Sequence, residues 1–415
     1  MTKAALATFP ALPDNTADAI AQEAKSVAAN YKPLPVMLHR GEGLYLWDRE
    51  GNKYLDMMSA YSAVSHGHSH PRIVAALSDQ AKTLAMTSRA FYTDTLAPFA
   101  QKLCALASLD MMLPMNTGAE AVETAVKAAR LWGYRDKKIP ENKAEIIVAA
   151  GNFHGRTTTI VSFSSEADYK KDFGPFTPGF VMTPYGDLGA IEKAITPDTC
   201  AVLLEPIQGE AGIVTPPQGF LKDLRALCDK HNVLLVLDEV QSGLGRTGKT
   251  FCFEHEGITP DLLILGKALG GGVLPVSAVV GKQKVLGLFK PGSHGSTFGG
   301  NPLACRVGYE ALCVLEDEQL VENSARLGAY MKAELEKIDH PAIRSVRGKG
   351  LWIGVDFDPA QVAARTVCEK LMARGILSKE THDTVVRFAP PLTITQKEID
   401  FCLGELKAVL KELNT

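Results

Sequence analysis

The chain has 415 residues, of which 46% are hydrophobic and 22% charged, and 44 basic and 47 acidic residues give it a net charge of −3. This length allows one large domain with a sizeable core plus a smaller domain, and the composition is ordinary for a soluble globular protein. The small net charge gives no electrostatic reason to expect nucleic acid or an acidic membrane as a partner, and no apolar run is long enough to span a bilayer.

The cysteines and the N-terminal segment bear on the cellular compartment. None of the eight cysteines belongs to a C-x-x-C pair, so a disulfide framework or zinc ribbon is not expected and a reducing compartment fits. Residues 1–29 contain three acidic residues and no arginine. Since this is neither a secretory signal nor an organelle transit peptide, we expect a cytoplasmic protein.

The first predicted elements are a hairpin and a histidine-rich turn. The run Leu44–Asp56 reads as two strands around the turn glycine Gly51. His66, His68 and His70 alternate in the sequence and could ligate zinc, but no carboxylate or cysteine nearby in sequence completes a site. We therefore expect no metal site, and predict that Pro71 opens a helix.

Short apolar runs that end on polar residues recur between residues 90 and 290, with helical or turn-rich segments between them. The polar tips of these runs are Asn116, Phe153, Glu205, Asp238 and Lys267. Unbroken runs of branched aliphatic residues are typical of strands buried on both faces, and alternation of strand and helix predicts a mostly parallel α/β sheet. The tips should then gather along one rim, where ligands bind in such folds.

Two of these tips have chemistry of their own. Asn116–Glu120 joins a strand to a helix through a Thr-Gly turn, which suits an anion because free N–H groups and the helix dipole converge there; an ordinary threonine cap explains it equally well. Asp238 and Lys267 follow neighbouring strands, and a fixed carboxylate beside a lysine suits a pyridinium cofactor held as a Schiff base. The alternative is two solvated charges at strand ends.

A glycine-rich loop imitates nucleotide-binding motifs. Gly243–Gly248 matches G-x-G-x-x-G, and Gly243–Thr250 matches G-x4-G-K-T in full. Both motifs require a helix directly afterwards, whereas Thr250–Phe253 is β-like and is followed by Gly257 and Pro260. We therefore expect a flexible glycine loop beside the cofactor and not a phosphate-binding loop.

The rest of the chain predicts a separate α+β unit. A helical run spans roughly Ala304–Ile338, strands are expected at Gly350–Val355 and Val385–Phe388, and Thr395–Glu398 is a capping box for the last helix. The predicted organisation is an N-terminal segment, residues 1–50, that packs with the small domain, a large cofactor-binding domain, 51–302, and a small domain, 303–415.

Long motifs in a fixed order carry a resemblance to a known family. They are Asn30–Pro35, Ser59–Val64, Ser88–Tyr92, Leu131–Tyr134, Leu237–Gln241 with Leu265–Lys267, Glu205–Ala211, His294–Thr297 and Arg387–Pro391. From Tyr31 to Leu410 the chain resembles the class III pyridoxal-phosphate-dependent aminotransferases, and within them the members that act on ornithine. The resemblance implies a fold-type-I α/β transferase, pyridoxal 5′-phosphate as cofactor, and a homodimer with active sites at the subunit interface.

The resemblance also implies roles for individual residues. Lys267 and Asp238 would be catalytic: the lysine forms the Schiff base and shuttles protons, and the carboxylate pairs with the pyridine nitrogen. The remaining cofactor contacts would come from Gly118, Ala119, Phe153, Val240, Gln241, Ser296 and Thr297, with Thr297 reaching the neighbouring subunit's phosphate. His154, Leu274 and Phe298 depart from what we expect of the family.

Substrate recognition would fall to Tyr31, Tyr61, Arg156, Glu210 and Arg387. The implied reaction moves the δ-amino group of L-ornithine to 2-oxoglutarate, with Glu210 neutralising Arg387 until a glutamate-like carboxylate arrives. Acetylornithine, 4-aminobutyrate or lysine as amino donor remains an alternative, and a phosphate-loop nucleotide hydrolase is the rival from another class.

Overall fold

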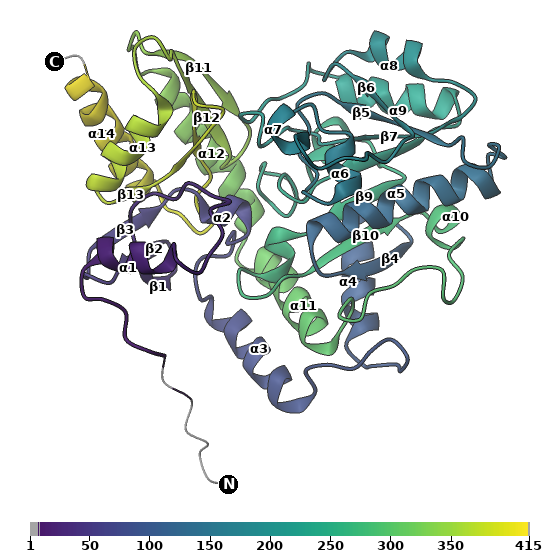
Figure 1. Cartoon of the computed structure of the whole chain (residues 1–415), viewed down its shortest axis with the longest axis horizontal. Coiled ribbons are helices and arrows are strands. Elements are labelled where there is room, and N and C mark those ends of the chain that lie inside the picture. Colours follow the sequence, from purple (N-terminus) through teal and green to yellow (C-terminus); the bar gives the residue numbers. More distant parts are fainter. Residues whose placement is uncertain (1–6, 8, 414–415) are drawn as a thin grey trace.

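The computed structural model describes residues 7 and 9–413, and a seven-stranded sheet forms the centre of its larger part (Figure 1). The strand order is β4 (Met111–Met115), β10 (Ser277–Gly281), β9 (Leu262–Leu265), β8 (Leu234–Asp238), β7 (Thr199–Leu204), β5 (Glu145–Ala149) and β6 (Phe180–Thr183). β10 is antiparallel to both of its neighbours, and the other pairings are parallel. The mostly parallel α/β sheet predicted from the sequence is therefore confirmed.

The predicted central strands are buried on both faces. Every residue of β7, β8, β9 and β10 is buried, because helices cover both sides of the sheet. The helices of this part are α4 (Leu96–Ala107), α5 (Gly118–Arg135), α6 (Thr158–Ser162), α7 (Ala167–Lys170), α8 (Leu188–Ala194), α9 (Phe220–Lys230) and α10 (Gln283–Leu286). The apolar side chains of α5 are buried, and the helix packs on β7, β9 and β10.

Two four-stranded sheets form the smaller part. One has the order β1 (Leu38–Glu42), β2 (Tyr45–Asp48), β3 (Lys53–Asp56) and β13 (Ile376–Leu377). The other has the order β11 (Ile343–Gly348), β12 (Ile353–Phe357), β15 (Val385–Phe388) and β14 (Lys379–Thr381). The parallel pairing of β3 with β13 joins the N-terminal strands to the C-terminal part of the chain.

The remaining helices connect or cover these sheets. They are α1 (Thr16–Glu23), α2 (Ser59–Ser62), α3 (Pro71–Thr83), α11 (Pro302–Asp317), α12 (Leu320–Glu336), α13 (Ala364–Ala373) and α14 (Gln396–Leu413). α3 begins at Pro71 and the hairpin β2–β3 forms, both as predicted. α11 packs on α3 and α4, whereas α12 packs on β11. The domain limits at residues 50 and 302 stay a prediction.

Two local predictions are wrong. The single helix expected over Ala304–Ile338 is divided where Gln319 takes a left-handed conformation with φ 53°, because α11 and α12 pack on different parts of the fold. The β-like stretch Thr250–Phe253 runs into a 3₁₀ helix, η1 (Cys252–Glu256). Its first backbone N–H groups bond to the Glu239 carboxylate and not to a neighbouring strand.

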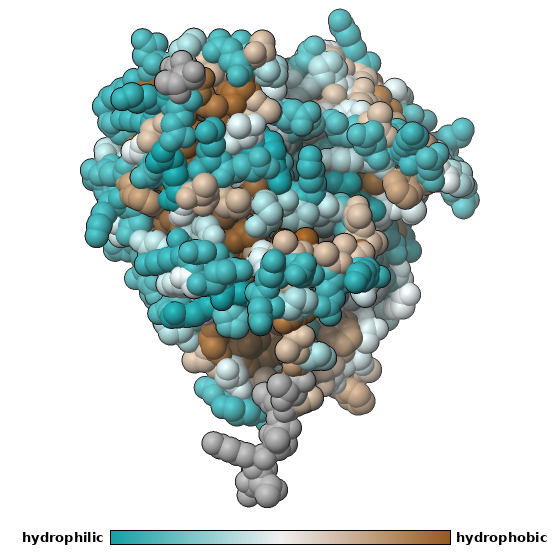
Figure 2. Space-filling model, turned by 60° about the vertical axis from the view of Figure 1, so that its left-hand side comes forward, coloured by the Kyte–Doolittle hydropathy of each residue, from teal (hydrophilic) through white to brown (hydrophobic). Residues whose placement is uncertain are grey.

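The surface is mostly polar, as expected from the ordinary content of charged residues. Figure 2 shows a mostly hydrophilic face with several separate hydrophobic patches. Among residues 7 and 9–413, no helix is both long enough and apolar enough to cross a membrane.

Candidate active site

The carboxyl ends of β8 and β9 place Asp238 and Lys267 at the same rim of the central sheet. β8 ends at Asp238. β9 ends at Leu265, Gly266 follows it, and Lys267 begins the 3₁₀ helix η2 (Lys267–Gly270). Lys267 has a left-handed φ of 45°, a conformation that a side-chain-bearing residue adopts at a cost and that is common at functional sites. Asp238 and Lys267 therefore follow neighbouring strands, as predicted from the sequence.

The Lys267 amine is suited to proton transfer. Burial lowers its pKa, an effect that the charges of Glu210 and Asp238 oppose without cancelling. No hydrogen bond or ion pair joins its Nζ to another residue in the described part of the chain. An amine whose pKa is lowered by burial and whose donors are free is a better nucleophile and base than an ordinary lysine amine, which suits it to form a Schiff base.

Asp238 is held by a histidine that the sequence did not single out as a site residue. His154 Nδ1 lies 2.7 Å from Asp238 Oδ2, and the Val240 N–H donates to Oδ1 at 3.0 Å. Burial acts to lower the pKa of His154, but the hydrogen bond and charge of Asp238 outweigh it, so the pKa is raised. Its position directly after Phe153 at a strand tip was the available signal. Only the fold shows that it faces Asp238.

Glu205 completes this buried cluster. Its carboxylate accepts hydrogen bonds from the N–H groups of Phe153 at 2.9 Å and Gly209 at 3.5 Å. Burial raises its pKa to about 7, with His154 acting in the opposite direction. The sequence identified Glu205 as a strand tip, but assigned it no role in the site.

The turn before α5 has backbone donors that are not used within the described part of the chain. Thr117 and Glu120 form a reciprocal capping box. In the described part of the chain, no hydrogen bond joins the backbone N–H of Gly118 or Ala119 to another group. Asn116 donates to Ser296 Oγ at 2.8 Å, which brings the loop before α11 to the same turn. These free N–H groups at a helix N-terminus fit a phosphate.

Val240 packs closely against two glycines of the candidate site. A Cβ on Gly118 would lie 3.1 Å from Val240 Cγ1, and one on Gly266 would lie 3.3 Å from the same atom, so both glycines are needed for this close packing. Gln241 is buried and donates to the Tyr61 carbonyl at 3.4 Å. Together with the free N–H groups, the lysine and the carboxylate, these residues fit a phosphorylated pyridine.

The substrate end contains the predicted ion pair. Glu210 Oε1 lies 2.7 Å from Arg387 Nη1, and the Tyr61 ring lies 4.8 Å from the Arg387 guanidinium carbon. The Arg387 side chain is 5% exposed and its Nε has no hydrogen-bond partner. The Glu210–Arg387 contact predicted from the sequence is confirmed, and the arginine keeps donors for a carboxylate.

The other predicted substrate residues are less enclosed. Arg156 is exposed and stacks on Tyr169 at 4.0 Å and on Phe153 at 5.5 Å, without a carboxylate partner among the described residues. Tyr31 is 70% exposed and shares with Tyr61 a hollow of about 490 Å³. Tyr169 was missed, because nothing in its local sequence marks it.

Thr297 is not brought to this site within one chain. It is exposed, and no hydrogen bond ties its side chain to the described residues, in contrast to Ser296. The proposed contact with a second subunit's phosphate is compatible with this exposure and stays a prediction.

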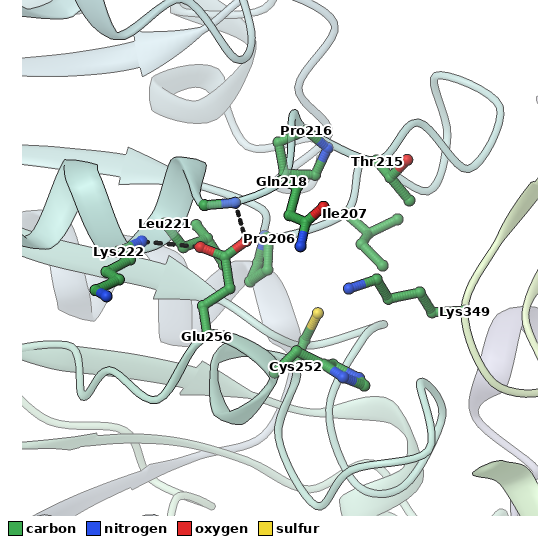
Figure 3. A pocket seen from close by; sticks show the side chains of 12 residues that line it. Pro206, Ile207, Thr215, Pro216, Gln218, Leu221, Lys222, Cys252, Glu256 and Lys349 are labelled. Carbon is green, nitrogen blue, oxygen red and sulfur yellow. Dashed lines mark hydrogen bonds between the residues drawn. The ribbon is translucent and has the colours of Figure 1, made fainter.

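A separate pocket of about 400 Å³ is lined in part by Pro206 and Ile207, which follow β7 (Figure 3). Cys252 and Lys349 face into it, and neither Lys267 nor Asp238 lines it. The N-terminus of α9 lies at this pocket, but its backbone donors already have a partner. The Glu256 carboxylate accepts hydrogen bonds from the N–H groups of Gly219 at 3.1 Å and Lys222 at 2.9 Å. The cofactor residues therefore define a different site.

A model of the family described as "Aminotransferase class-III" matches residues 26–410, which include Lys267, Asp238 and the N-terminus of α5. The chain belongs to this family, whose cofactor is pyridoxal 5′-phosphate. An ornithine aminotransferase of Brevibacillus brevis is 56% identical over 391 residues, which are 94% of this chain and 97% of that protein.

Solved structures agree with this assignment. The ornithine aminotransferase of Toxoplasma gondii superposes with a TM-score of 0.95 at 43% identity, covering 97% of this chain and 95% of that one. An acetylornithine aminotransferase of Elizabethkingia anophelis gives a TM-score of 0.87 at 46% identity, covering 96% and 99%. The fold-type-I architecture is thereby shown, and the amino donor is treated below.

Proposed function

We propose that this aminotransferase is an ornithine δ-aminotransferase, which converts L-ornithine and 2-oxoglutarate to L-glutamate 5-semialdehyde and L-glutamate. The observation that carries the proposal is the Glu210–Arg387 ion pair beside Lys267. Such a pair lets one site accept an ω-amine and, at another time, an α-carboxylate. The names of the relatives from B. brevis and T. gondii support the same donor.

Each cofactor residue has a part in the chemistry. When bound, pyridoxal 5′-phosphate supplies a pyridine ring that accepts electrons from the substrate carbon. Asp238, oriented by His154, would hold the proton on the ring nitrogen, and Gly118 and Ala119 would bind the phosphate. Lys267 would move the proton to and from the substrate carbon, a task to which its lowered pKa suits it.

Phe153, Val240 and Gln241 would enclose the ring. Val240, which packs on Gly118 and Gly266, would contact one face of the ring. Phe153 would stack on the opposite face, and Gln241 would meet the ring hydroxyl. Ser296 would complete the phosphate site, and Thr297 would reach the phosphate of the neighbouring subunit's cofactor.

The charges of the proposed substrates suggest a role for each substrate-binding residue. Ornithine presents a δ-ammonium, which an unpaired Arg387 would repel, so Glu210 would stay paired during that half-reaction. Arg156, which has no carboxylate partner among the described residues, would bind the distal carboxylate, and Tyr31 and Tyr61 would line the pocket. Glutamate and 2-oxoglutarate would displace Glu210 and take a bidentate contact with Arg387.

Acetylornithine is the second candidate donor, since the E. anophelis enzyme of that name is 46% identical to this chain. The test is a single-turnover absorbance experiment in which purified holoenzyme is mixed with ornithine, acetylornithine, 4-aminobutyrate or lysine. Fastest loss of the lysine-bound cofactor absorbance with ornithine is expected. Faster reaction with acetylornithine would overturn the choice of donor while leaving the family assignment intact.

The wider proposal includes assembly and location. Phe91, Tyr92 and Phe298 are exposed by 72%, 106% and 58%, and segment 88–93 lines one pocket together with Gly300. These aromatic residues would be covered in a homodimer, with the active sites at the interface. A cytoplasmic enzyme whose semialdehyde product cyclises to pyrroline-5-carboxylate would serve arginine breakdown or proline synthesis.

A further inference from the structure

The glycine loop Gly243–Gly248 packs an arginine into the protein interior. Gly245 and Gly248 have φ values of 89° and 83°, and a Cβ on Gly248 would lie 2.7 Å from Ala325 Cα in α12. The glycines therefore allow close packing of the loop against α12, and not contact with a phosphate. The loop carries Arg246, whose side chain is completely buried.

Arg246 joins parts of the chain that are distant in sequence. Its Nη1 donates to the carbonyls of Leu351 at 2.9 Å and Pro390 at 2.6 Å. Its Nη2 donates to Ser59 Oγ at 3.1 Å and Ser65 Oγ at 2.9 Å. Ser59 is the first residue of α2 and Ser65 follows that element, and Pro390 lies just beyond β15, the strand that carries Arg387.

The segment between those hydroxyls is a strained left-handed turn. Ser59, Ala60, Tyr61 and Ser62 have φ values of 43°, 47°, 57° and 72°. A left-handed conformation is sterically unfavourable for each residue with a side chain, so the surroundings must hold the turn. Besides the Arg246 bond, Ser59 Oγ donates to the Ala389 carbonyl at 2.6 Å, and Asp56 Oδ1 accepts the N–H groups of Met58 and Ser59, each at 2.8 Å.

This turn presents Tyr61 to the active site in two ways. Its ring lies on the Arg387 guanidinium, and its carbonyl accepts from Gln241. We propose that Arg246 is a positioning residue for substrate recognition, which fixes the left-handed turn against the strand of Arg387 and thereby sets the Tyr61–Arg387 contact. The four hydrogen bonds of Arg246 go to protein groups, so it would act on the substrate only through Tyr61 and Arg387.

The expected effect is on binding of the acceptor. If Tyr61 is displaced, Arg387 loses the ring that orients it towards a substrate carboxylate, while Lys267 and Asp238 are unaffected. A lost contact that is equally strong in the ground and transition states raises KM and leaves kcat unchanged. The use of 2-oxoglutarate as acceptor rests on the proposed function.

The experiment compares holoenzyme of the wild type, Arg246→Lys, and Arg246→Lys with Ala60→Gly. Lysine keeps the charge but cannot donate to four acceptors as the guanidinium fork does. We expect KM for 2-oxoglutarate to rise about 10-fold in Arg246→Lys with kcat within about 3-fold. Glycine adopts the left-handed conformation without steric cost, so the double variant should recover KM to within about 3-fold of the wild type.

Arg225→Lys is the matched control, since Arg225 is a largely buried arginine that pairs with Asp261 and Asp229 away from the turn. It should leave KM unchanged whatever it does to thermal stability. Should Arg246→Lys not fold, Ser65→Ala retains the arginine and removes one acceptor, and a KM rise of about 3-fold that Ala60→Gly reverses is expected.

Three results would overturn the inference: no KM change in the foldable variants, an equal change in Arg225→Lys, or no recovery with Ala60→Gly. A wild type that does not turn over ornithine would instead contradict the proposed function. The Arg246 effect would then be read from the glutamate half-reaction alone.

Discussion

Glu210 and Arg387 meet at 2.7 Å between Oε1 and Nη1 although 177 residues separate them in the chain. Their exposures differ: the Arg387 side chain is 5% exposed and that of Glu210 is 23% exposed. The arginine is fixed in β15, whereas the carboxylate belongs to the segment after β7. We therefore expect Glu210, and not Arg387, to be the partner that moves towards solvent when a substrate carboxylate binds.

Replacing Glu210 by alanine should separate the two half-reactions. With Arg387 left unpaired, the reaction with ornithine should slow by about 10-fold or more, because its ammonium meets an uncompensated guanidinium, and the reaction with glutamate should become faster. Single-turnover absorbance changes measure both rates. Glu310→Ala, at a carboxylate that pairs with Arg72 and Arg306, is the control, and equal effects of Glu210→Ala on both substrates would refute the gate.

Lys267→Ala should abolish turnover and the visible absorbance of the lysine-bound cofactor together. The amine is the single covalent anchor that the proposed chemistry provides, and alanine cannot replace it. A spectrum of the purified variant, with bound phosphate measured separately, checks this. Retention of both the absorbance and the activity would remove the central assignment.

His154→Phe should weaken cofactor retention. The substitution leaves Asp238 Oδ2 without its 2.7 Å partner. Loss of one buried hydrogen-bond partner costs about 1–3 kcal/mol, so the cofactor Kd should rise about 10-fold or more. Equilibrium dialysis of reconstituted enzyme measures this, with His231→Gln as a control at a partly exposed histidine whose Nε2 lies 3.8 Å from Glu192. An unchanged Kd would show that His154 does not orient the carboxylate.

Glu205→Gln should alter the pH dependence of stability. Burial raises the Glu205 pKa in the folded protein from the ordinary 4.5 to about 7. The folded state therefore keeps a proton that the unfolded chain releases, and this contribution is present below pH 4.5 and lost as the pH rises through about 7.

The whole shift corresponds to about 3 kcal/mol. Glutamine does not titrate, so the urea midpoint of the variant should fall less than that of the wild type as the pH rises from about 5 to about 7.5. Glu336→Gln, at an exposed carboxylate on α12, should behave as the wild type. Parallel curves for Glu205→Gln and the wild type would contradict the assignment.

Local sequence determined much of the fold and part of the site. The buried strands β7, β8 and β9 follow from unbroken aliphatic runs, and the capped N-terminus of α5, where we predict an anion site, follows from a Thr-Gly turn with Glu120 three residues after Thr117. Their positions at one rim follow from parallel topology alone. The resemblance carried by the long family motifs predicted roles for Tyr31, Arg156, Glu210 and Arg387, which spacing does not provide.

Tertiary structure decided the contacts between segments that are distant in the chain. The His154–Asp238 and Arg246–Ser59 contacts, the left-handed turn at Tyr61 and the division between α11 and α12 each depend on which surfaces pack together. A left-handed turn of residues with side chains opposes local preference, so no local pattern predicts it. Local preferences fix strands, caps and turns over a few residues, whereas burial against another part of the chain determines which charged and strained groups are stable there.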